Sequence, residues 1–391
     1  MVTATADGCS VVTHDDQAHS PASTDWDKAI DTLRSERRTQ SEHRGNAQRF
    51  LDKLFSGAQL QEIGGLGQDR GGSPDGLLCG WCEYDSQPYF VVIEDESGLA
   101  PGYPKPVTAI AKTARIQQLA RQRSWPIIER VALPRRSQAS TVGAEFGIYG
   151  YGIDFNGQLR LRENSPRCVL MAGEIYAETA LECALADYVV HVSVDTVEEH
   201  GNLVVDAVVE DESDGITRIH QYLELVIQRQ SEEPPGQPQA SPFLWDEDSW
   251  LVLKPVSKSA LSTGLARVAG NTVGVARFIE GTLDTSACQR LIRLIQLCEF
   301  RKLPLLWVLE GDVDMQMPLR YVGNVVRTLR NFTQPICQIQ PDGKMEQWSE
   351  STALLSRVVP ADNRILLDQR EPLMSLRQCI ASAIANRTWS P

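Results

Sequence analysis

Long apolar runs are absent from this sequence of 391 residues. No run approaches the roughly 20 consecutive apolar residues that a membrane-spanning helix needs, so we expect no association with a membrane. The opening residues, MVTATADGCSVVTHDDQAHS, have neither a basic start nor an apolar core. They do not match a secretory signal, and we therefore expect a cytoplasmic protein with residues 1–24 as a disordered tail.

Positive charge and histidine are also scarce. The chain has 38 Lys and Arg against 51 Asp and Glu, a formal net charge of −13, and only six His. A nucleic-acid surface needs clustered Lys and Arg to meet the phosphates, so this balance excludes a nucleic-acid partner. No G-x-S-x-G motif or His-rich constellation is present, which argues against a hydrolase-type catalytic triad.

Motifs for metals and phosphates are missing as well. Cys79 and Cys82 form a single CxxC without a second pair or a nearby His, and the other cysteines are scattered, so we expect buried thiols rather than zinc ligands or disulfides. The glycine-rich residues 64–76 lack the Gly-Lys-Ser/Thr ending of a phosphate-binding loop. Asp312 and Asp314 could hold a divalent cation, but two acids in a loop are weak evidence, and we predict no metal site.

The chain is long enough for two domains. SEEPPGQPQAS, residues Ser231–Ser241, is rich in proline and has no apolar periodicity, which is typical of a linker. We therefore predict an N-terminal domain over 25–230, a linker over 231–245 and a C-terminal domain over 246–391.

Local patterns in the two halves repeat. In the first half, strands Leu77–Tyr84 and Tyr89–Glu94 form a predicted hairpin, followed by a helix and by a strand that starts at Pro126. In the second half, two strands flank Gly270-Asn271, and a helix again precedes a strand introduced by Pro304. This order predicts a duplicated α/β domain with parallel strands joined by helical crossovers.

The stretch Pro166–Val192 is central to the first half. A short apolar run ends at Gly173, small and helix-forming residues follow from Ala177 to Ala186, and a second apolar run covers Tyr188–Val192. The backbone N–H groups at such a strand-to-helix turn converge and can hold an oxyanion, such as that of an enolised thioester. The alternative is a well-packed α/β turn that binds nothing.

Several segments in this order resemble the carboxyltransferase (beta) subunits of biotin-dependent acyl-CoA carboxylases. The resemblance covers almost the whole chain. Its main segments are RFLDKLFSGAQLQEI (Arg49–Ile63), the hairpin Asp75–Ser97, the stretch Pro166–Val192 and STGLARVAGNTVGVA (Ser262–Ala276). We interpret the chain as a diverged member of this family.

The resemblance implies a duplicated crotonase-like β-β-α superhelix. It also implies that the first domain binds an acyl-CoA or acyl-carrier thioester, and that the second domain of a partner subunit receives carboxybiotin, a co-substrate that is not covalently bound to this chain. The site would then lie at a dimer interface of a homo-oligomer, either a dimer or a trimer of dimers, served by biotin carboxylase and carrier subunits. The reaction would be carboxyl transfer through an enolate, with backbone N–H groups stabilising the oxygens.

The resemblance also implies specific site residues. In the first oxyanion turn the N–H donors would be Ala177 and Glu178, at positions where the family has a glycine pair, with Gly173 setting the turn. Tyr176 could donate a proton or could simply pack. The other candidates are Glu346 and Gln347 in the second oxyanion turn, and Arg135 and Arg136 for coenzyme A phosphates or a substrate carboxylate.

Glu346 and Gln347 also stand near a glycine pair of the family, and these two altered pairs leave two alternatives beside carboxyl transfer. A decarboxylase of a malonyl-type thioester passes through the same enolate and needs no biotin. A non-catalytic subunit could instead survive as the assembly partner of an intact carboxyltransferase. An enzyme should bind a thioester when purified alone, whereas an assembly subunit should not.

Overall fold

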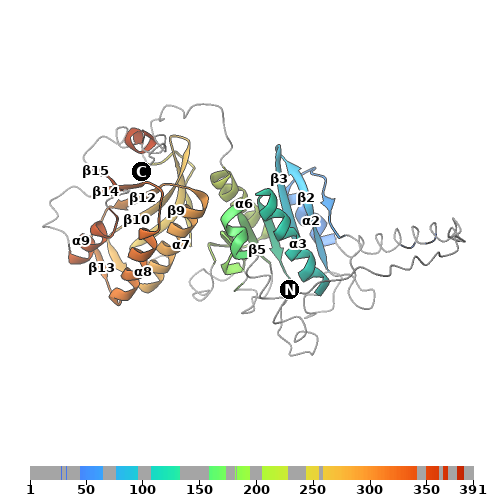
Figure 1. Ribbon diagram of the computed structural model, residues 1–391, viewed down its shortest axis with the longest axis horizontal. Coiled ribbons are helices and arrows are strands. Elements are labelled where there is room, and N and C mark those ends of the chain that lie inside the picture. Colours follow the sequence, from blue (N-terminus) through green and yellow to red (C-terminus); the bar gives the residue numbers. More distant parts are fainter. Residues whose placement is uncertain are drawn as a thin grey trace, which may run out of the picture.

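The computed structural model describes most of both predicted domains, in the ranges 45–64, 76–95, 107–132, 158–172, 181, 183–193, 205–227, 244–254, 259–340, 349–360, 364–368 and 377–382, with Lys28 and Thr32 in addition. The predicted tail and the linker segment Ser231–Ser241 lie outside these residues. The chain forms two α/β units side by side, each built on its own sheet (Figure 1). No helix within these ranges is long and apolar enough to cross a membrane.

The first sheet has its strands in chain order, from β1 to β7. The strands are β1 (Gln61–Glu62), β2 (Leu77–Tyr84), β3 (Gln87–Glu94), β4 (Ile127–Val131), β5 (Arg167–Met171), β6 (Tyr188–Val192) and β7 (Ala207–Val209). Strands β1, β2 and β3 pair antiparallel, and every pairing from β3 to β7 is parallel. The carboxyl ends of β3 to β7 therefore lie in a row, and this row of strand ends forms one edge of the sheet.

The second sheet has the order β15-β14-β12-β10-β9-β8. Its strands are β8 (Leu251–Leu253), β9 (Leu261–Val268), β10 (Asn271–Phe278), β12 (Leu305–Leu309), β14 (Ile336–Gln340) and β15 (Arg364–Asp368), and a separate parallel pair joins β11 (Gly281–Leu283) to β13 (Val313–Met315). Again β9 and β10 form an antiparallel hairpin, and β10, β12, β14 and β15 are parallel. The predicted duplication is confirmed, because β2 to β6 match β9, β10, β12, β14 and β15 in order and direction.

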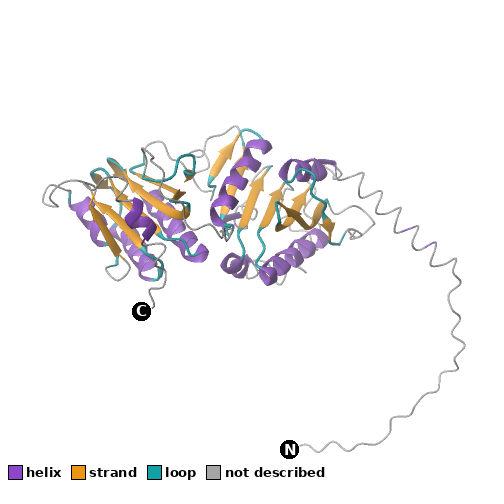
Figure 2. Cartoon of the chain, turned by 90° about the horizontal axis from the view of Figure 1, so that it is seen from above, coloured by secondary structure: helices purple, strands orange, loops and turns teal. Residues whose placement is uncertain are grey.

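Helices lie on the faces of both sheets (Figure 2). They are α2 (Gly45–Leu54), α3 (Val107–Arg123), α6 (Glu212–Val226), α7 (Thr285–Arg301), α8 (Leu319–Arg330) and α9 (Glu350–Arg357). Carboxylates cap two of them: Asp211 accepts hydrogen bonds from the first turn of α6, and Asp284 accepts one from Ala287 N of α7.

Prolines begin equivalent strands in the two units. The carbonyl of Pro126 accepts a hydrogen bond from Phe90 N, and the carbonyl of Pro304 accepts one from Gly274 N, both at 2.9 Å. Proline has no N–H to donate to a ladder, so it is best placed just before a strand starts. Both predicted strands are present, although the first begins at Ile127, one residue later than predicted.

The two hairpin turns differ slightly from those predicted. In the first, the chain turns at Asp85 and Ser86, with φ of 51° and 60°. In the second, the turn residues are Ala269 and Gly270, with φ of 50° and 79°, and Asn271 already belongs to β10. Two consecutive residues with positive φ form the kind of tight turn that matches the twist of the strands.

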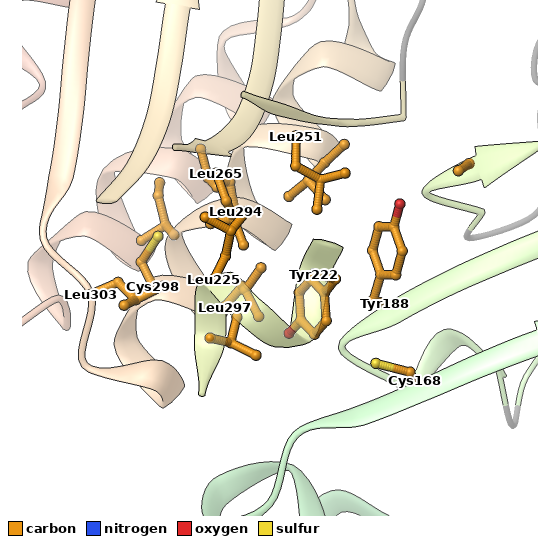
Figure 3. Packing of buried hydrophobic residues seen from close by; sticks show 14 of the residues in the cluster. Cys168, Tyr188, Tyr222, Leu225, Leu251, Leu265, Leu294, Leu297, Cys298 and Leu303 are labelled. Carbon is orange, nitrogen blue, oxygen red and sulfur yellow. The ribbon is translucent and has the colours of Figure 1, made fainter. Parts of the chain in front are cut away.

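One continuous apolar core crosses from the first unit to the second (Figure 3). Tyr222 of α6 stacks on Tyr188 of β6, with ring centroids 4.7 Å apart. Leu225 of α6, Leu251 of β8 and Leu294 of α7 belong to the same cluster. The contact between the units is therefore packed like a protein interior.

Helix α7 adds buried charge to this contact. Arg293 donates two hydrogen bonds to Asp206, from Nε at 3.1 Å and from Nη2 at 2.6 Å. Arg301 Nη2 lies 2.9 Å from Asp187 Oδ2 and also donates to the carbonyls of Arg162 and Ser165. Two arginines of the second unit are thus held by two aspartates and several carbonyls of the first.

We expect Gly274→Ala to lower the free energy of unfolding by about 1–3 kcal/mol, because an added Cβ would lie 2.1 Å from Cys298 Sγ in the packed core. Gly323→Ala in α8 is the matched control, since nothing lies within 4 Å of its added Cβ. That control should stabilise the helix by up to about 1 kcal/mol. Urea unfolding checks both, and equal effects of the two variants would contradict the packing at β10.

Candidate active site

Every predicted site residue lies outside the described residues, but the strands that flank them are described. Residues 173–180, with Gly173, Tyr176, Ala177 and Glu178, follow the carboxyl end of β5. Residues 133–157, with Arg135 and Arg136, follow β4, and residues 341–348, with Glu346 and Gln347, follow β14. The strand register tells us which edge of each sheet these segments leave.

In the first unit the flanking strands end level with one another. Val131 of β4 pairs with Met171 of β5, which pairs with His191 of β6. The segments that carry Arg135 and Ala177 therefore leave the same edge of the sheet, from neighbouring strands. In open α/β sheets this edge is the usual place for a ligand site.

The second unit repeats this arrangement at β14. This strand lies between β12 and β15, as β5 lies between β4 and β6. In both units a segment leaves the carboxyl end of that strand and leads into helical residues, namely 181 and 183–184 in the first unit and α9 in the second. Both segments predicted to form oxyanion turns therefore follow equivalent strands of the duplicated fold. Backbone N–H groups at a helix start can stabilise a negative oxygen.

A buried polar network supports this edge in the first unit. Arg130 of β4 donates to the carbonyl of Glu94 at 2.6 Å and pairs with Glu212 of α6 at 2.7 Å. The carboxylate of Glu94 accepts a hydrogen bond from Ala132 N at 3.0 Å. This bond fixes the backbone just before the segment that carries Arg135 and Arg136.

Our sequence reasoning did not identify these buried polar residues. Glu94, Asp95, Arg130 and His191 are all buried in or beside strands of the first sheet. His191 precedes the last residue of β6 and therefore lies near the edge from which the predicted site segments leave. The available signal was the presence of charged or titratable residues within otherwise apolar strands, which require partners when buried.

Asp312 of the second unit is already occupied by protein contacts. Its carboxylate accepts hydrogen bonds from Thr352 Oγ1 at 2.6 Å and Ser349 N at 3.1 Å, and these bonds lower its pKa. Asp314 accepts a hydrogen bond from Gln316 Nε2. No group of three or more His, Cys, Asp or Glu suited to a metal occurs among the described residues.

The cysteines are placed for packing. Seven of the eight that the structure describes are buried, including Cys79 and Cys82 in β2, as expected for strand cysteines. Burial raises the pKa of Cys82 and of Cys288 to about 11, and that of Cys337 to about 12. The thiolate is the nucleophilic form, so these side chains are poor candidates for covalent catalysis.

Comparison with known proteins gives no match by sequence and several by structure. No protein-family model and no curated protein matches the chain. A single-chain, multi-domain long-chain acyl-CoA carboxylase matches with a TM-score of 0.62 and 19% identity over 81% of this chain. That match spans only 40% of the length of the carboxylase chain.

Two crystal structures of transcarboxylase 12S, a hexameric multienzyme core, match over most of both chains. The one with hydrolysed methylmalonyl-coenzyme A gives a TM-score of 0.70 at 16% identity, and covers 93% of this chain and 95% of that one. The one with methylmalonyl-coenzyme A and methylmalonic acid gives 0.68 at 14% identity, with the same coverage. At such identity the likeness establishes the fold, and the chain therefore has the duplicated crotonase-like fold of these carboxyltransferases.

Proposed function

We propose that this chain acts on an acyl-coenzyme A thioester through an enolate, with carboxyl transfer as its reaction. The observation that supports this most strongly is the position of the two oxyanion turns predicted from the sequence. Each follows the carboxyl end of the equivalent strand, β5 or β14, in the two copies of the fold. The likeness to transcarboxylase 12S over 93% of the chain agrees with this reaction class.

The first turn would stabilise the thioester enolate. Backbone N–H groups of Ala177 and Glu178 would donate to its oxygen, and Arg135 and Arg136 would meet the phosphates or the carboxylate of the substrate. Carboxybiotin, presented by a carrier partner, would supply the carbon dioxide. The Glu178 carboxylate must turn away from the enolate, because a like charge beside it would raise the barrier.

Decarboxylation of a malonyl-type thioester is the second candidate, favoured by two hydrogen bonds in the second unit. Ser349 caps α9 by accepting a hydrogen bond from Thr352 N, and Asp312 occupies Ser349 N. Two N–H groups at the start of this helix thus already have acceptors, and the preceding segment carries the acid Glu346. A biotin oxyanion fits poorly there, whereas decarboxylation does not require one.

The experiment is incubation of the purified protein with malonyl-coenzyme A and methylmalonyl-coenzyme A, followed by mass spectrometry of the thioesters. Loss of carbon dioxide without biotin would assign decarboxylation. Turnover only after addition of biotin carboxylase and a biotin carrier would assign carboxyl transfer. Absence of both turnover and thioester binding would contradict the enzyme proposal and indicate a non-catalytic subunit.

Self-association belongs to the same proposal. The transcarboxylase 12S core that shares this fold is a hexamer, and we propose that this chain also forms a homo-oligomer, with one site shared between the first unit of one copy and the second unit of another. Light scattering coupled to gel filtration measures the state directly. Biotin carboxylase and carrier subunits would be the further partners of a carboxyl-transfer enzyme.

A further inference from the structure

A cleft of about 390 Å³ lies between the two units and is lined by both. Its volume is within the range of small-molecule sites. One part of its lining is apolar, formed by Ala184, Val205, Leu253, Ile292 and Leu294. The charged part consists of Arg162 and Asp206 from the first unit and Lys254, Arg290 and Arg293 from the second.

This cleft lies at the opposite edge of the first sheet from the proposed active site. Arg162 lies shortly before β5 begins, and Asp206 directly precedes β7. The predicted thioester turn instead follows the carboxyl end of β5. The strands are parallel, so their amino ends and their carboxyl ends lie at opposite edges of the sheet. The cleft is therefore separate from the proposed thioester site.

Positive charge exceeds negative charge among the described residues that line the cleft. Four cationic side chains face one carboxylate, that of Asp206, and Arg293 already binds this carboxylate with two hydrogen bonds. Arg162 has Asp187 at 3.5 Å, but Asp187 also accepts a shorter bond from Arg301 at 2.9 Å. Arg162 therefore shares Asp187 with Arg301. Arg290 makes no ion pair among the described residues, and the nearby charge of Asp284 offsets only part of its burial.

Both side chains are nearly removed from water and keep unused donors. Arg290 is only 6% exposed, and its Nε has no hydrogen-bond partner among the described residues. Its other nitrogens donate to the Lys254 carbonyl and to Ser259 Oγ, which are both neutral. The side chain of Arg162 is 11% exposed, and its Nε and Nη2 likewise have no hydrogen-bond partner. Buried donors of this kind are costly unless something accepts from them.

The electrostatics agree with this geometry. Burial lowers the pKa of Arg162 and of Arg290, because desolvation disfavours their charged forms. Burial also lowers the pKa of Lys254, and the positive charge of Arg290 lowers it further. A bound anion would offset all three effects at once.

We propose that this cleft binds a small organic phosphate, separately from the thioester site. The phosphate oxygens would accept charge-assisted hydrogen bonds from Arg162 and Arg290, whose planar donor groups suit a phosphate. The organic part would lie against the apolar lining. A ligand bound here contacts both units and stabilises their packing.

The test is isothermal titration calorimetry of the full chain with ribose 5-phosphate, with ribose as the phosphate-free probe. We expect ribose 5-phosphate to bind and ribose not to bind. Arg162→Gln and Arg290→Gln should each weaken binding about tenfold or more, because each removes a charged donor. Arg327→Gln, an exposed arginine of α8 outside the cleft, is the matched control and should bind like the wild type.

Two further measurements keep the result interpretable. Arg290→Lys retains the charge and should regain part of the affinity if Arg290→Gln proves unstable. Ribose 5-phosphate should raise the thermal unfolding temperature of the wild type and of Arg327→Gln, and raise that of Arg162→Gln and Arg290→Gln much less.

The phosphate group recognised here could also be that of the coenzyme A tail. In that case Arg162→Gln and Arg290→Gln would weaken acyl-coenzyme A binding as well. An unchanged affinity for the thioester supports a separate site. Absence of ribose 5-phosphate binding at millimolar concentration, or equal binding by all variants, would overturn the proposal, and neither outcome bears on enolate chemistry.

Discussion

Asp187→Asn is expected to lower the free energy of unfolding by about 3–5 kcal/mol, the usual cost of breaking a buried ion pair from one side. Asp187 is 1% exposed, and its Oδ2 accepts from Arg301 Nη2 at 2.9 Å and from Arg167 N at 2.8 Å. The asparagine has nearly the same shape but no charge. Arg301, whose side chain is 5% exposed, would then stay buried without a counter-charge.

Glu310→Gln is the matched control for this variant. Glu310 pairs with Arg277 at 2.7 Å in the second unit, but the two side chains are 30% and 41% exposed. Water solvates such a pair in either state, so the loss should be about 1 kcal/mol or less. Urea unfolding followed by tryptophan fluorescence compares the two variants. Equal losses of unfolding free energy would show that the buried ion pair between the units stabilises the fold no more than a surface ion pair does.

Ala177→Pro is expected to reduce turnover about 100- to 1,000-fold, the usual effect of removing one donor from an oxyanion hole. Proline has no N–H, and this substitution deletes the backbone donor that we assign to the enolate oxygen. The sequence predicts that a helix begins at this residue, and proline is tolerated in the first turn of a helix. The measurement is steady-state kinetics on the malonyl-type thioester that the first assay identifies.

Ala177→Ser provides the matched control, because it keeps the backbone N–H and adds only a small side chain. We expect it to retain most of the turnover. The thioester KM of the proline variant should change little, since the donor matters most when negative charge develops on the oxygen. Turnover of the proline variant close to that of the serine variant would remove Ala177 from the mechanism.

Much of the fold could be predicted because it depends on local pattern. The apolar run Tyr188–Val192 is a strand with those bounds, and the strand introduced by Pro304 covers Leu305–Leu309. Short apolar runs flanked by polar or turn residues mark buried strands. In α7, Leu291, Leu294 and Cys298 recur at helical spacing, which predicts one inward face, and all three are buried. The second hairpin turn was misplaced by one residue, because Ala269, and not Asn271, forms the turn with Gly270.

Less of the candidate site could be predicted. The order of strands and turns predicts the two oxyanion turns after equivalent strands, and the fold has β5 and β14 in equivalent positions. The turns themselves lie outside the described residues. The buried network of Glu94, Arg130 and Glu212 was not predicted, because residues 130 and 212 meet only after four parallel strands have assembled. Periodicity shows which side of an element is buried, and it does not identify the partner of a buried charge.

The sequence by itself therefore determined the duplicated order of hairpin, helix and parallel strands, and it predicts the position in that order where an oxyanion would bind. These features rest on neighbours within one element or one turn. The tertiary structure alone decided how the two units are joined and where the cationic cleft lies. Arg301 and Asp187 are 114 residues apart in the chain, and Arg162 lines the same cleft as Arg290 although each belongs to a different unit. Contacts between residues so far apart in the chain form only when both folded units pack together. The packed contact has a low dielectric, which strengthens the interactions between the buried charges.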